Sequence, residues 1–360
     1  METVRRISKK IRLRDRYIGG GEDISVQSMT NCPAHDFEGT LKQALRLQEA
    51  GCDIVRMAVP DEDAAPVFSF LKNGGVSIPL VADIHFDYKL ALAALRGGAD
   101  KIRINPGNIG EGWKVRQVAD ACKAAGVPIR IGVNGGSLDK KLLEKYGSPT
   151  AQALAESALT QAEMLEDMGF SDIVISIKSS RIATACEAAR IVAADSEYPL
   201  HLGVTEAGTE YSGIIKNAIG IGSLLCDGIG DTLRVSLTAD PVREVTAGKE
   251  ILKSLGLLRG GIDIISCPTC GRTAIDLISI ADEFRRRSAS LDTGNKKICV
   301  AVMGCAVNGP GEAREADIGI AGGDGFALLF KNGKTVCRIE EERAVDVLIE
   351  ETKKLISEKE

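Results

Sequence analysis

Lys101-Ile-Arg-Ile-Asn-Pro106 is the stretch of sequence that decides the fold class. It reads as a short strand with Arg103 and Asn105 on one side and isoleucines on the other, because strand side chains alternate with a period of two. A helical pattern follows over residues 112–125 and leads into a second strand of the same kind, Pro128–Asn134. Strand, helix and strand in this order predict the βαβ unit of a parallel sheet.

The same rhythm extends in both directions from this unit. The expected strands are Ser25–Thr30, Asp53–Val59, Leu80–His85, Lys101–Pro106, Pro128–Asn134, Asp172–Ser179, Leu200–Thr205 and Thr232–Leu237. Eight β–α repeats of this length predict an α/β fold of the TIM (β/α)8 barrel type. An open doubly wound sheet is the alternative, but no Gly-rich dinucleotide fingerprint follows the first strand.

Helix-capping residues support these boundaries. Gly51, Gly126 and Gly169 each follow an expected helix, in the position where glycine commonly ends one. Asp240-Pro241 combines an N-cap residue with a proline at the first helical position.

Basic residues cluster toward the C-terminal halves of the expected strands, the face where TIM barrels place their active sites. They are Arg56, Arg103, Arg130, Lys178 and Arg234. Converging cations repel one another unless an anion joins them, and arginine forms forked hydrogen bonds with phosphate oxygens. The pattern favours a phosphate or diphosphate ligand, with Asn105 and Asn134 as neutral donors. The alternative is a set of structural ion pairs with the carboxylates of Asp83, Asp87, Glu206 and Asp231.

Three further polar residues are candidates for proton transfer. Asp83 and His85 lie two positions apart at one strand end, where both side chains are expected to face the barrel interior. They could act as an acid/base or substrate-positioning pair, although a single histidine in a barrel is often a core residue. Glu206 follows another strand end and could donate or accept a proton.

The composition changes after Leu258-Arg-Gly-Gly-Ile262, which predicts a barrel domain over residues 1–258 and a smaller α+β domain over residues 261–360. The second domain is expected to contain a strand leading into Cys267, a helix over about residues 273–288 and a strand Lys297–Met303 leading into Cys305. A further strand at 318–321, a hairpin turning at Asn332-Gly333 and a charged helix over about residues 341–357 complete it.

The cysteines of the second domain are arranged for a metal centre. Cys267 and Cys270 form a C-x-x-C pair, and Cys305 lies in a loop rich in Gly and Pro that continues to Glu312. Three thiolates can hold a 4Fe–4S cluster, with Glu312 as an exchangeable ligand of the fourth iron. Structural zinc is the alternative, but it prefers four closed Cys or His ligands, and no histidine follows His201.

Composition limits the remaining possibilities. The net charge of −5 over 360 residues argues against a nucleic-acid partner. No apolar run is long enough to span a membrane and no signal-peptide pattern begins the chain, so a reducing cytoplasm is expected. In that compartment the other cysteines are expected to be mostly buried, inert packing residues. They are Cys32, Cys52, Cys122, Cys186, Cys226, Cys299 and Cys337.

The short linker after Gly260 suggests how the two domains act together. The last barrel helix normally runs away from the mouth, so a short linker hinders the cysteine domain from covering its own barrel. A head-to-tail homodimer, in which one subunit's cluster domain covers the partner's barrel, would solve this problem.

The chain resembles a known enzyme family along nearly its whole length. The motifs are Val26-Gln-Ser-Met-Thr30, Ile54-Val-Arg-Met-Ala-Val-Pro60, Ala82-Asp-Ile-His-Phe86, Ile102-Arg-Ile-Asn-Pro-Gly-Asn-Ile-Gly110, Arg130-Ile-Gly-Val-Asn-Gly-Gly-Ser137, Gly203-Val-Thr-Glu-Ala-Gly208, Ser266-Cys-Pro-Thr-Cys-Gly-Arg272 and Met303-Gly-Cys-Ala-Val-Asn-Gly-Pro-Gly-Glu-Ala313. In this order they resemble the 4-hydroxy-3-methylbut-2-enyl diphosphate synthases, in the bacterial two-domain form of the non-mevalonate isoprenoid pathway.

The resemblance implies a TIM barrel joined to a 4Fe–4S domain, in a homodimer with shared active sites. Cys267, Cys270, Cys305 and Glu312 would hold the cluster. The substrate would be 2-C-methyl-D-erythritol 2,4-cyclodiphosphate, opened and reductively dehydroxylated with two electrons from flavodoxin or ferredoxin. The positions that match the diphosphate-binding residues are Arg56, Arg103, Asn105, Arg130, Asn134 and Lys178. Asp83, His85 and Glu206 match polar positions near the reacting carbons.

Two other classes of function remain open at this stage. One is a non-redox barrel transferase for a phosphorylated substrate, with a structural zinc, comparable in architecture to the pterin-binding barrels. The other is an electron carrier or scaffold whose barrel only binds a regulator, although a polar barrel mouth counts against it.

Overall fold

The computed structural model describes residues 4–305 and 313–358 and divides the chain into two compact units, one up to Leu257 and one from Leu258. In the first unit, eight parallel strands form a sheet in the order β8-β7-β6-β5-β4-β3-β10-β9. A parallel bridge between Ile175 and Leu200 joins β8 to β9 and closes the ring. The predicted TIM barrel is thereby confirmed, and the open sheet is excluded.

Each observed barrel strand lies within a predicted one. The strands are β3 (Ser25–Met29), β4 (Ile54–Ala58), β5 (Leu80–Asp83), β6 (Lys101–Ile104), β7 (Ile129–Asn134), β8 (Ile173–Lys178), β9 (His201–Leu202) and β10 (Thr232–Leu233). The sheet leaves its regular geometry before the predicted ends at several strands, so that His85 and Asn105 belong to the loops that follow β5 and β6.

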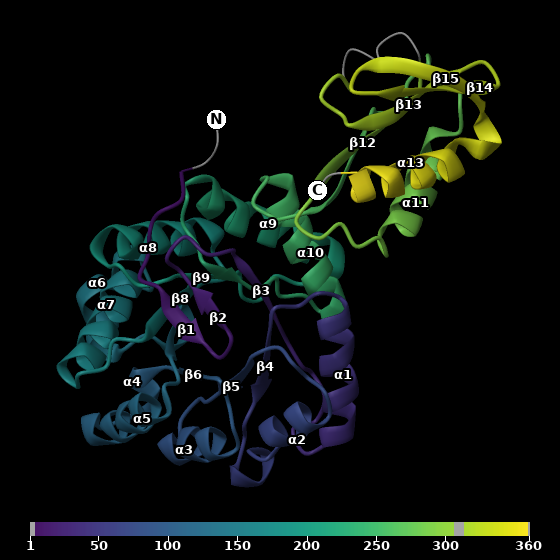
Figure 1. Ribbon diagram of the computed structural model, residues 1–360. Coiled ribbons are helices and arrows are strands. Elements are labelled where there is room, and N and C mark those ends of the chain that lie inside the picture. Colours follow the sequence, from purple (N-terminus) through teal and green to yellow (C-terminus); the bar gives the residue numbers. More distant parts are fainter. Residues whose placement is uncertain (1–3, 306–312, 359–360) are drawn as a thin grey trace. The chain divides into compact units, whose positions relative to one another are not determined.

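Helices surround the barrel strands, as Figure 1 shows. They are α1 (Phe37–Glu49), η1 (Glu62–Ala64), α2 (Val67–Asn73), α3 (Tyr88–Arg96), α4 (Pro106–Ile109), α5 (Gly112–Ala125), η2 (Gly135–Ser137), α6 (Lys140–Tyr146), α7 (Ala151–Asp167), α8 (Ile182–Asp195), α9 (Glu210–Cys226) and α10 (Pro241–Ser254). The expected caps are present. Gly126 ends α5 with a φ of 64°, and the side chain of Asp240 accepts a hydrogen bond from the amide of Val242 at the start of α10.

An N-terminal hairpin that was not predicted closes one end of the barrel. It consists of β1 (Ile11–Leu13) and β2 (Arg16–Ile18), which pair antiparallel. Leu13 and Ile18 are fully buried in one cluster with inward-facing residues from the starts of three strands, Ile54, Val81 and Val174. This cluster forms an apolar floor that covers the N-terminal end of the polar interior.

The second unit is a five-stranded sheet in the order β11-β12-β13-β14-β15. Its elements are β11 (Gly261–Ser266), α11 (Leu277–Ser288), β12 (Lys297–Met303), β13 (Ile318–Gly323), β14 (Phe326–Lys331), β15 (Lys334–Glu340), η3 (Glu341–Arg343) and α13 (Ala344–Glu358). Strands β11, β12 and β13 are parallel, while β14 and β15 form the expected hairpin, with φ of 47° at Asn332 and 72° at Gly333. Helices α11 and α13 share a hydrophobic core with one face of the sheet.

Two sequence-based expectations need correction. The helix expected from residue 273 begins only at Leu277, because the hydroxyl of Thr273 accepts a hydrogen bond from the Cys270 amide and Asp276 is the N-cap. The expectation of mostly buried cysteines fails at Cys226 and Cys337, which are exposed. Over the described residues, no helix is long and apolar enough to cross a membrane.

Candidate active site

Arg103 reaches from β6 across the neighbouring strand into the barrel interior. Its Nη1 lies 3.2 Å from Oδ1 of Asp83, and it is only 6 % exposed. Its guanidinium fits here because residue 132 on β7 is glycine. An added Cβ at Gly132 would lie 2.4 Å from the Arg103 Nε. The predicted inward direction of the polar side chains is therefore correct at this strand.

Asp83, at the end of β5, lies within ion-pair distance of several basic side chains. Besides Arg103, its carboxylate lies 3.6 Å from Nη2 of Arg56 and 3.3 Å from Nε2 of His85. Burial alone would raise the pKa of this carboxyl, but Arg56, His85 and Arg103 outweigh burial and hold the pKa well below its usual value. Asp83 is thus an anion at neutral pH, and His85, with a side chain 53 % exposed, extends from it toward solvent.

Arg130 and Lys178 contribute further positive charge from the next two strands. Arg130 is fully buried, and its Nη1 donates to Oε1 of Gln27 on β3 at 3.2 Å. Lys178 at the end of β8 is 9 % exposed and extends past Gly203, where an added Cβ would lie 3.3 Å from its Nζ. Burial, followed by the charges of Arg56 and Arg234, lowers the pKa of Lys178 well below its usual value. An anion near this amine would favour its charged form.

Arg234 has a structural partner that sequence reasoning missed. Its Nε and Nη2 lie 3.2 and 3.1 Å from the two carboxylate oxygens of Glu244, which is buried in the first turn of α10. Glu244 also accepts from the hydroxyl of Ser28 at 2.8 Å. Of the carboxylates proposed as structural partners of the cations, Asp83 takes that role, whereas Asp231 lies 3.6 Å from Arg5 instead.

A cavity of about 610 Å³ opens beside these residues at the strand ends that follow β7, β8 and β9. It is lined by Asn134, Gly135, Gly136, Ser148, Pro149, Ser179, Ser180, Arg181, Thr205 and Glu206. The amide oxygen of Asn134, in its better orientation, accepts from Nη2 of Arg103 at 3.2 Å and so connects the cavity to the interior cations. Asn105 is buried and caps α4 through the amide of Gly107.

The cavity contains both predicted and unexpected residues. Glu206 is exposed in its wall and adopts a φ of 55°, in a region rarely used by residues other than glycine. Ser148, Ser179 and Arg181 were not predicted as site residues. Their position immediately before α7 or after β8 was the available signal, because active-site residues of barrels lie in such loops.

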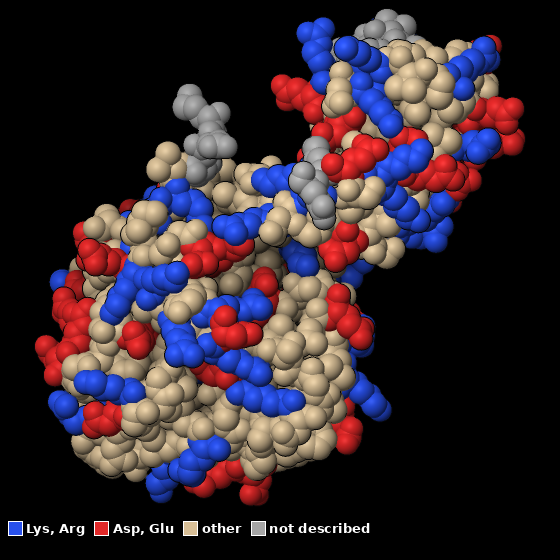
Figure 2. Space-filling model, viewed as in Figure 1, with Lys and Arg blue, Asp and Glu red and all other residues tan. Residues whose placement is uncertain are grey.

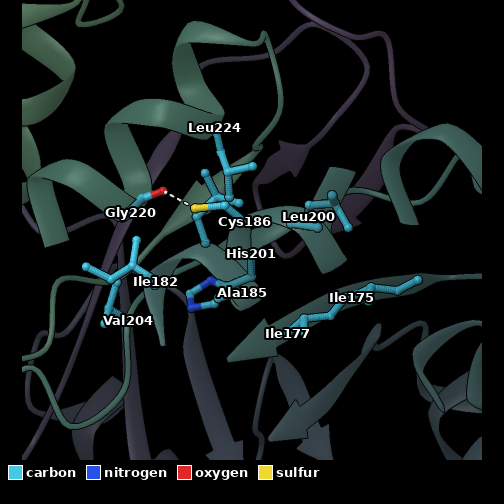
Figure 3. A pocket seen from close by; sticks show the side chains of 13 residues that line it. Ile175, Ile177, Ile182, Ala185, Cys186, Leu200, His201, Val204, Gly220 and Leu224 are labelled. Carbon is cyan, nitrogen blue, oxygen red and sulfur yellow. Dashed lines mark hydrogen bonds between the residues drawn. The ribbon is translucent and has the colours of Figure 1, made fainter. Parts of the chain in front are cut away.

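A second, much smaller cavity of about 20 Å³ lies among β8, β9, α8 and α9 (Figure 3). Its lining is mainly aliphatic, and the thiol of Cys186 lies 3.5 Å from the carbonyl oxygen of Gly220. The volume is close to that of a single water molecule. His201, which borders it, is buried and has its Nδ1 2.7 Å from the hydroxyl of Thr232. This cavity is a packing feature of the barrel wall.

In the second unit, the topology brings two of the three predicted thiols to the same end of the sheet, and Cys270 follows three positions after Cys267. Cys267 follows β11 and Cys305 follows β12, and these two strands are adjacent and parallel. The sulfur of Cys267 accepts from the amide of Gly304 at 3.2 Å, next to Cys305 in the chain. Hydrogen bonds from the backbone and side chain of Arg272 lower the pKa of the exposed Cys270. Glu312 lies outside the described residues.

The thiols therefore fit a metal centre by chemistry and by topology. All three are free, one already accepts a backbone hydrogen bond, and one has a lowered pKa, which favours the thiolate that binds metals. Within residues 4–305 and 313–358, no three Cys, His, Asp or Glu side chains converge as a finished metal site. Figure 2 shows acidic and basic side chains intermixed over the visible surface of each unit, in contrast to the cationic barrel interior.

Comparison of the sequence with known protein families shows the family to which this chain belongs. Residues 8–249 match the GcpE TIM-barrel domain, and residues 263–354 match the GcpE protein C-terminal domain. The chain belongs to the GcpE family. Curated members of the family resemble it along nearly its entire length. A protein of Caldanaerobacter subterraneus is 54 % identical over 99 % of this chain and 100 % of its own length, and one of Clostridium perfringens is 58 % identical over 96 % and 98 %. Both are named 4-hydroxy-3-methylbut-2-en-1-yl diphosphate synthase (flavodoxin).

Solved structures support the barrel part of the GcpE fold. The dihydropteroate synthase of Thermus thermophilus covers 69 % of this chain with a TM-score of 0.50 at 16 % identity, over 99 % of its own length. The type I 3-dehydroquinate dehydratase of Clostridium difficile covers 70 % with a TM-score of 0.50 at 14 % identity, over 98 % of its own length. At such low identity these likenesses show the fold alone.

Proposed function

We propose that this chain opens and reductively dehydroxylates 2-C-methyl-D-erythritol 2,4-cyclodiphosphate to 4-hydroxy-3-methylbut-2-enyl diphosphate, using two electrons. It is an oxidoreductase of isoprenoid biosynthesis, like the relatives that match it from end to end. The observation that carries the proposal is the excess of buried cations around Asp83 in the barrel interior, beside an open cavity. A cyclic diphosphate brings the negative charge that this interior lacks.

The barrel residues bind and orient the substrate. Arg56, Arg103, Arg130 and Lys178 contact the diphosphate, and Asn105 and Asn134 add neutral hydrogen bonds. Most of these cations are buried, and the floor of Leu13 and Ile18 covers one end of the interior, so their charges act in a medium of lower dielectric constant than water and stabilise an anion more strongly. As the ring opens, the diphosphate leaves C2 with growing negative charge, and the fixed arginines stabilise it without having to reorganise.

The polar residues at the rim handle protons. Asp83, held as an anion, orients His85, whose exposed ring can give or take a proton near the reacting carbons. Glu206 stands in the cavity wall and can protonate the departing hydroxyl group. Water leaves in the reaction, so a proton donor at that oxygen is required.

The second unit holds a 4Fe–4S cluster through Cys267, Cys270 and Cys305, with Glu312 as a displaceable ligand. The donor set of three free thiols, one with a lowered pKa, fits such a cluster by its chemistry. When bound, the cluster supplies low-potential electrons one at a time and a Lewis acid for the oxygen that leaves. Flavodoxin or ferredoxin is the donor, and the enzyme is a cytoplasmic homodimer in which the cluster domain covers the partner's barrel.

The decisive experiment is an anaerobic purification with iron and sulfide analysis, followed by an assay of the cyclodiphosphate with dithionite and a mediator. We expect a brown protein with about four iron and four sulfide per chain, and turnover. Arg103→Ala should weaken substrate binding and leave the cluster spectrum unchanged. A colourless protein that takes up zinc and cannot be reconstituted with iron and sulfide would overturn the proposal.

The role of Glu312 is tested separately. Glu312→Gln should leave the cluster largely assembled, because three thiolates remain, and should impair turnover. Unchanged kinetics of this variant would remove Glu312 from the mechanism without affecting the rest of the proposal.

A further inference from the structure

One buried amine in the barrel interior has no role in the binding site described above. Lys101 is the first residue of β6 and is fully buried. Its Nζ is without a hydrogen-bond partner among the described residues. A charged ammonium group in such a place would carry a large desolvation cost, because a buried charge is normally paired and hydrogen-bonded.

The groups around Lys101 are mostly positive or neutral. Arg130 from β7 and Arg56 from β4 lie close enough that, after burial itself, their charges lower the pKa of the Lys101 amine well below its usual value. His201 from β9 faces the same interior, where burial, Arg130 and Lys178 lower its pKa, so the ring is neutral. On β5, the residue in register with Lys101 is Val81, part of the apolar floor.

The charges of the whole interior do not balance. The inward cations are Arg56, Lys101, Arg103, Arg130, Lys178 and Arg234. The buried carboxylates near them are Asp83 and Glu244, while Asp231 pairs with Arg5 of the N-terminal segment. Guanidinium groups remain charged in proteins, whereas lysine loses its proton readily when buried. Loss of a proton from a lysine therefore reduces the excess of positive charge. Of the two lysines, Lys101 and Lys178, Lys101 is the more deeply buried.

We propose that the amine of Lys101 is uncharged in the empty barrel and takes up one proton when the cyclic diphosphate binds at the mouth. This inference rests on the proposed function, because it takes the diphosphate as the anion. The two negative charges of the ligand offset the repulsion from Arg56 and Arg130, and so favour the ammonium form of Lys101. One proton passes from bulk water to Nζ, no covalent bond to the substrate forms, and the proton returns to water when the product leaves.

The inference gives Lys101 a role in binding without contact to the ligand. Proton uptake makes affinity depend on pH: it falls by up to about tenfold per pH unit above the pKa of the free amine, until the pKa of the bound state is passed. The cyclodiphosphate itself is suited to the test, because a diphosphate diester has no proton to lose near neutral pH. Without a reductant it binds and is not turned over.

The experiment is calorimetric titration of the full-length protein with the cyclodiphosphate, in buffers of equal pH and different ionisation enthalpy. At about pH 8 we expect the wild-type protein to take up at least about one proton per ligand, because Lys178, which contacts the diphosphate, also has a lowered pKa. Lys101→Met, which keeps the shape of the side chain without the amine, should take up about one proton fewer per ligand than the wild type. Lys42→Met, at an exposed position on α1, should bind and take up protons like the wild type.

The outcomes separate this inference from the proposed function. Equal proton uptake by Lys101→Met and wild type, or ligand binding without uptake by the wild type between about pH 7 and 9, would overturn the role of Lys101 alone. No binding of the cyclodiphosphate to the wild type would overturn the proposed function as well. If Lys101→Met folds poorly, Lys101→Gln supplies the same test with a neutral polar group.

Discussion

The carboxylate of Asp83 shows how one residue can hold several charges in place. It is 3 % exposed and lies within ion-pair distance of Arg56, His85 and Arg103. Removing such a carboxylate leaves its partners buried without compensation, and this costs more than the ion pair itself contributes. The same carboxylate therefore stabilises the fold and orients the side chains of Arg56 and Arg103.

Asp83→Asn tests this role. We expect the variant to lose about 3–5 kcal/mol of unfolding free energy at neutral pH, because two arginines remain buried beside a neutral amide. Denaturant unfolding followed by the fluorescence of Trp113, the single tryptophan, reports on the barrel unit. The control is Asp227→Asn, at an exposed ion pair with Arg190, where about 1 kcal/mol or less is expected.

The difference in unfolding free energy between the wild type and Asp83→Asn should depend on pH. The folded-state pKa of Asp83 lies well below its usual value, so its stabilising effect is fully present above the unfolded pKa of about 3.9. The effect is lost as pH falls below that value toward the folded pKa. A difference that shrinks already between about pH 8 and 5 would show that another group is responsible.

For a single residue, the direction of the side chain can be predicted from sequence when the strand that carries the residue determines it. Arg103 could be assigned to the interior because alternation along β6 leaves it one direction. Glu244 could not be foreseen as the partner of Arg234, because the pairing depends on how α10 packs against the barrel. The exposure of Cys226 and Cys337 likewise depends on what covers a helix end or an edge strand, which composition does not reveal.

Among the secondary-structure elements, β7 makes room for a side chain of its neighbouring strand. Gly132 stands in the middle of this strand between two inward polar residues, Arg130 and Asn134. A Cβ at this position would lie 2.4 Å from Nε and 2.5 Å from Nη2 of Arg103. The glycine therefore provides space for the guanidinium of the neighbouring strand.

Gly132→Ala should displace Arg103 and leave the fold intact, since the far end of a flexible side chain can move. We expect the Kd of the cyclodiphosphate to rise by about tenfold, equivalent to about 1.4 kcal/mol. The loss of stability should be smaller than for Asp83→Asn, because Asp83 keeps Arg56 and His85 as partners. Gly222→Ala in α9 is the matched control, because an added Cβ there meets nothing within 4 Å and the residue does not line the cavity. Equal affinity of the two variants would mean that Arg103 does not depend on the space at Gly132.

Helices and strands could be predicted where the hydrophobic pattern and the residues that end an element, such as glycine, indicate the same boundaries. The eight barrel strands combine short apolar runs with glycine-ended helices, and each was located from sequence. The β1–β2 hairpin was not, because strands of three residues give too little alternation to recognise. Its place beneath the barrel follows from the burial of Leu13 and Ile18, which is a tertiary property.

For the molecule as a whole, the chemistry is divided between two units with separate cores. The cations proposed to bind the substrate belong to the barrel, and Cys267, Cys270 and Cys305 belong to the second unit. The proposed reductive dehydroxylation needs both sets, so the proposal requires that they come together during turnover. In the proposed head-to-tail dimer, they meet between subunits, and each active site is built from two chains.

Mixing two inactive variants tests this arrangement. Arg103→Ala disables the barrel and Cys305→Ala disables the cluster, so each homodimer should be inactive. After the two are unfolded, mixed and refolded together with iron and sulfide, half of the dimers are mixed, and one of their two sites combines an intact barrel with an intact cluster. Activity should therefore return to roughly a quarter of the wild-type level. Co-refolded dimers that remain inactive, while wild type treated in the same way recovers, would show that each cluster serves its own barrel.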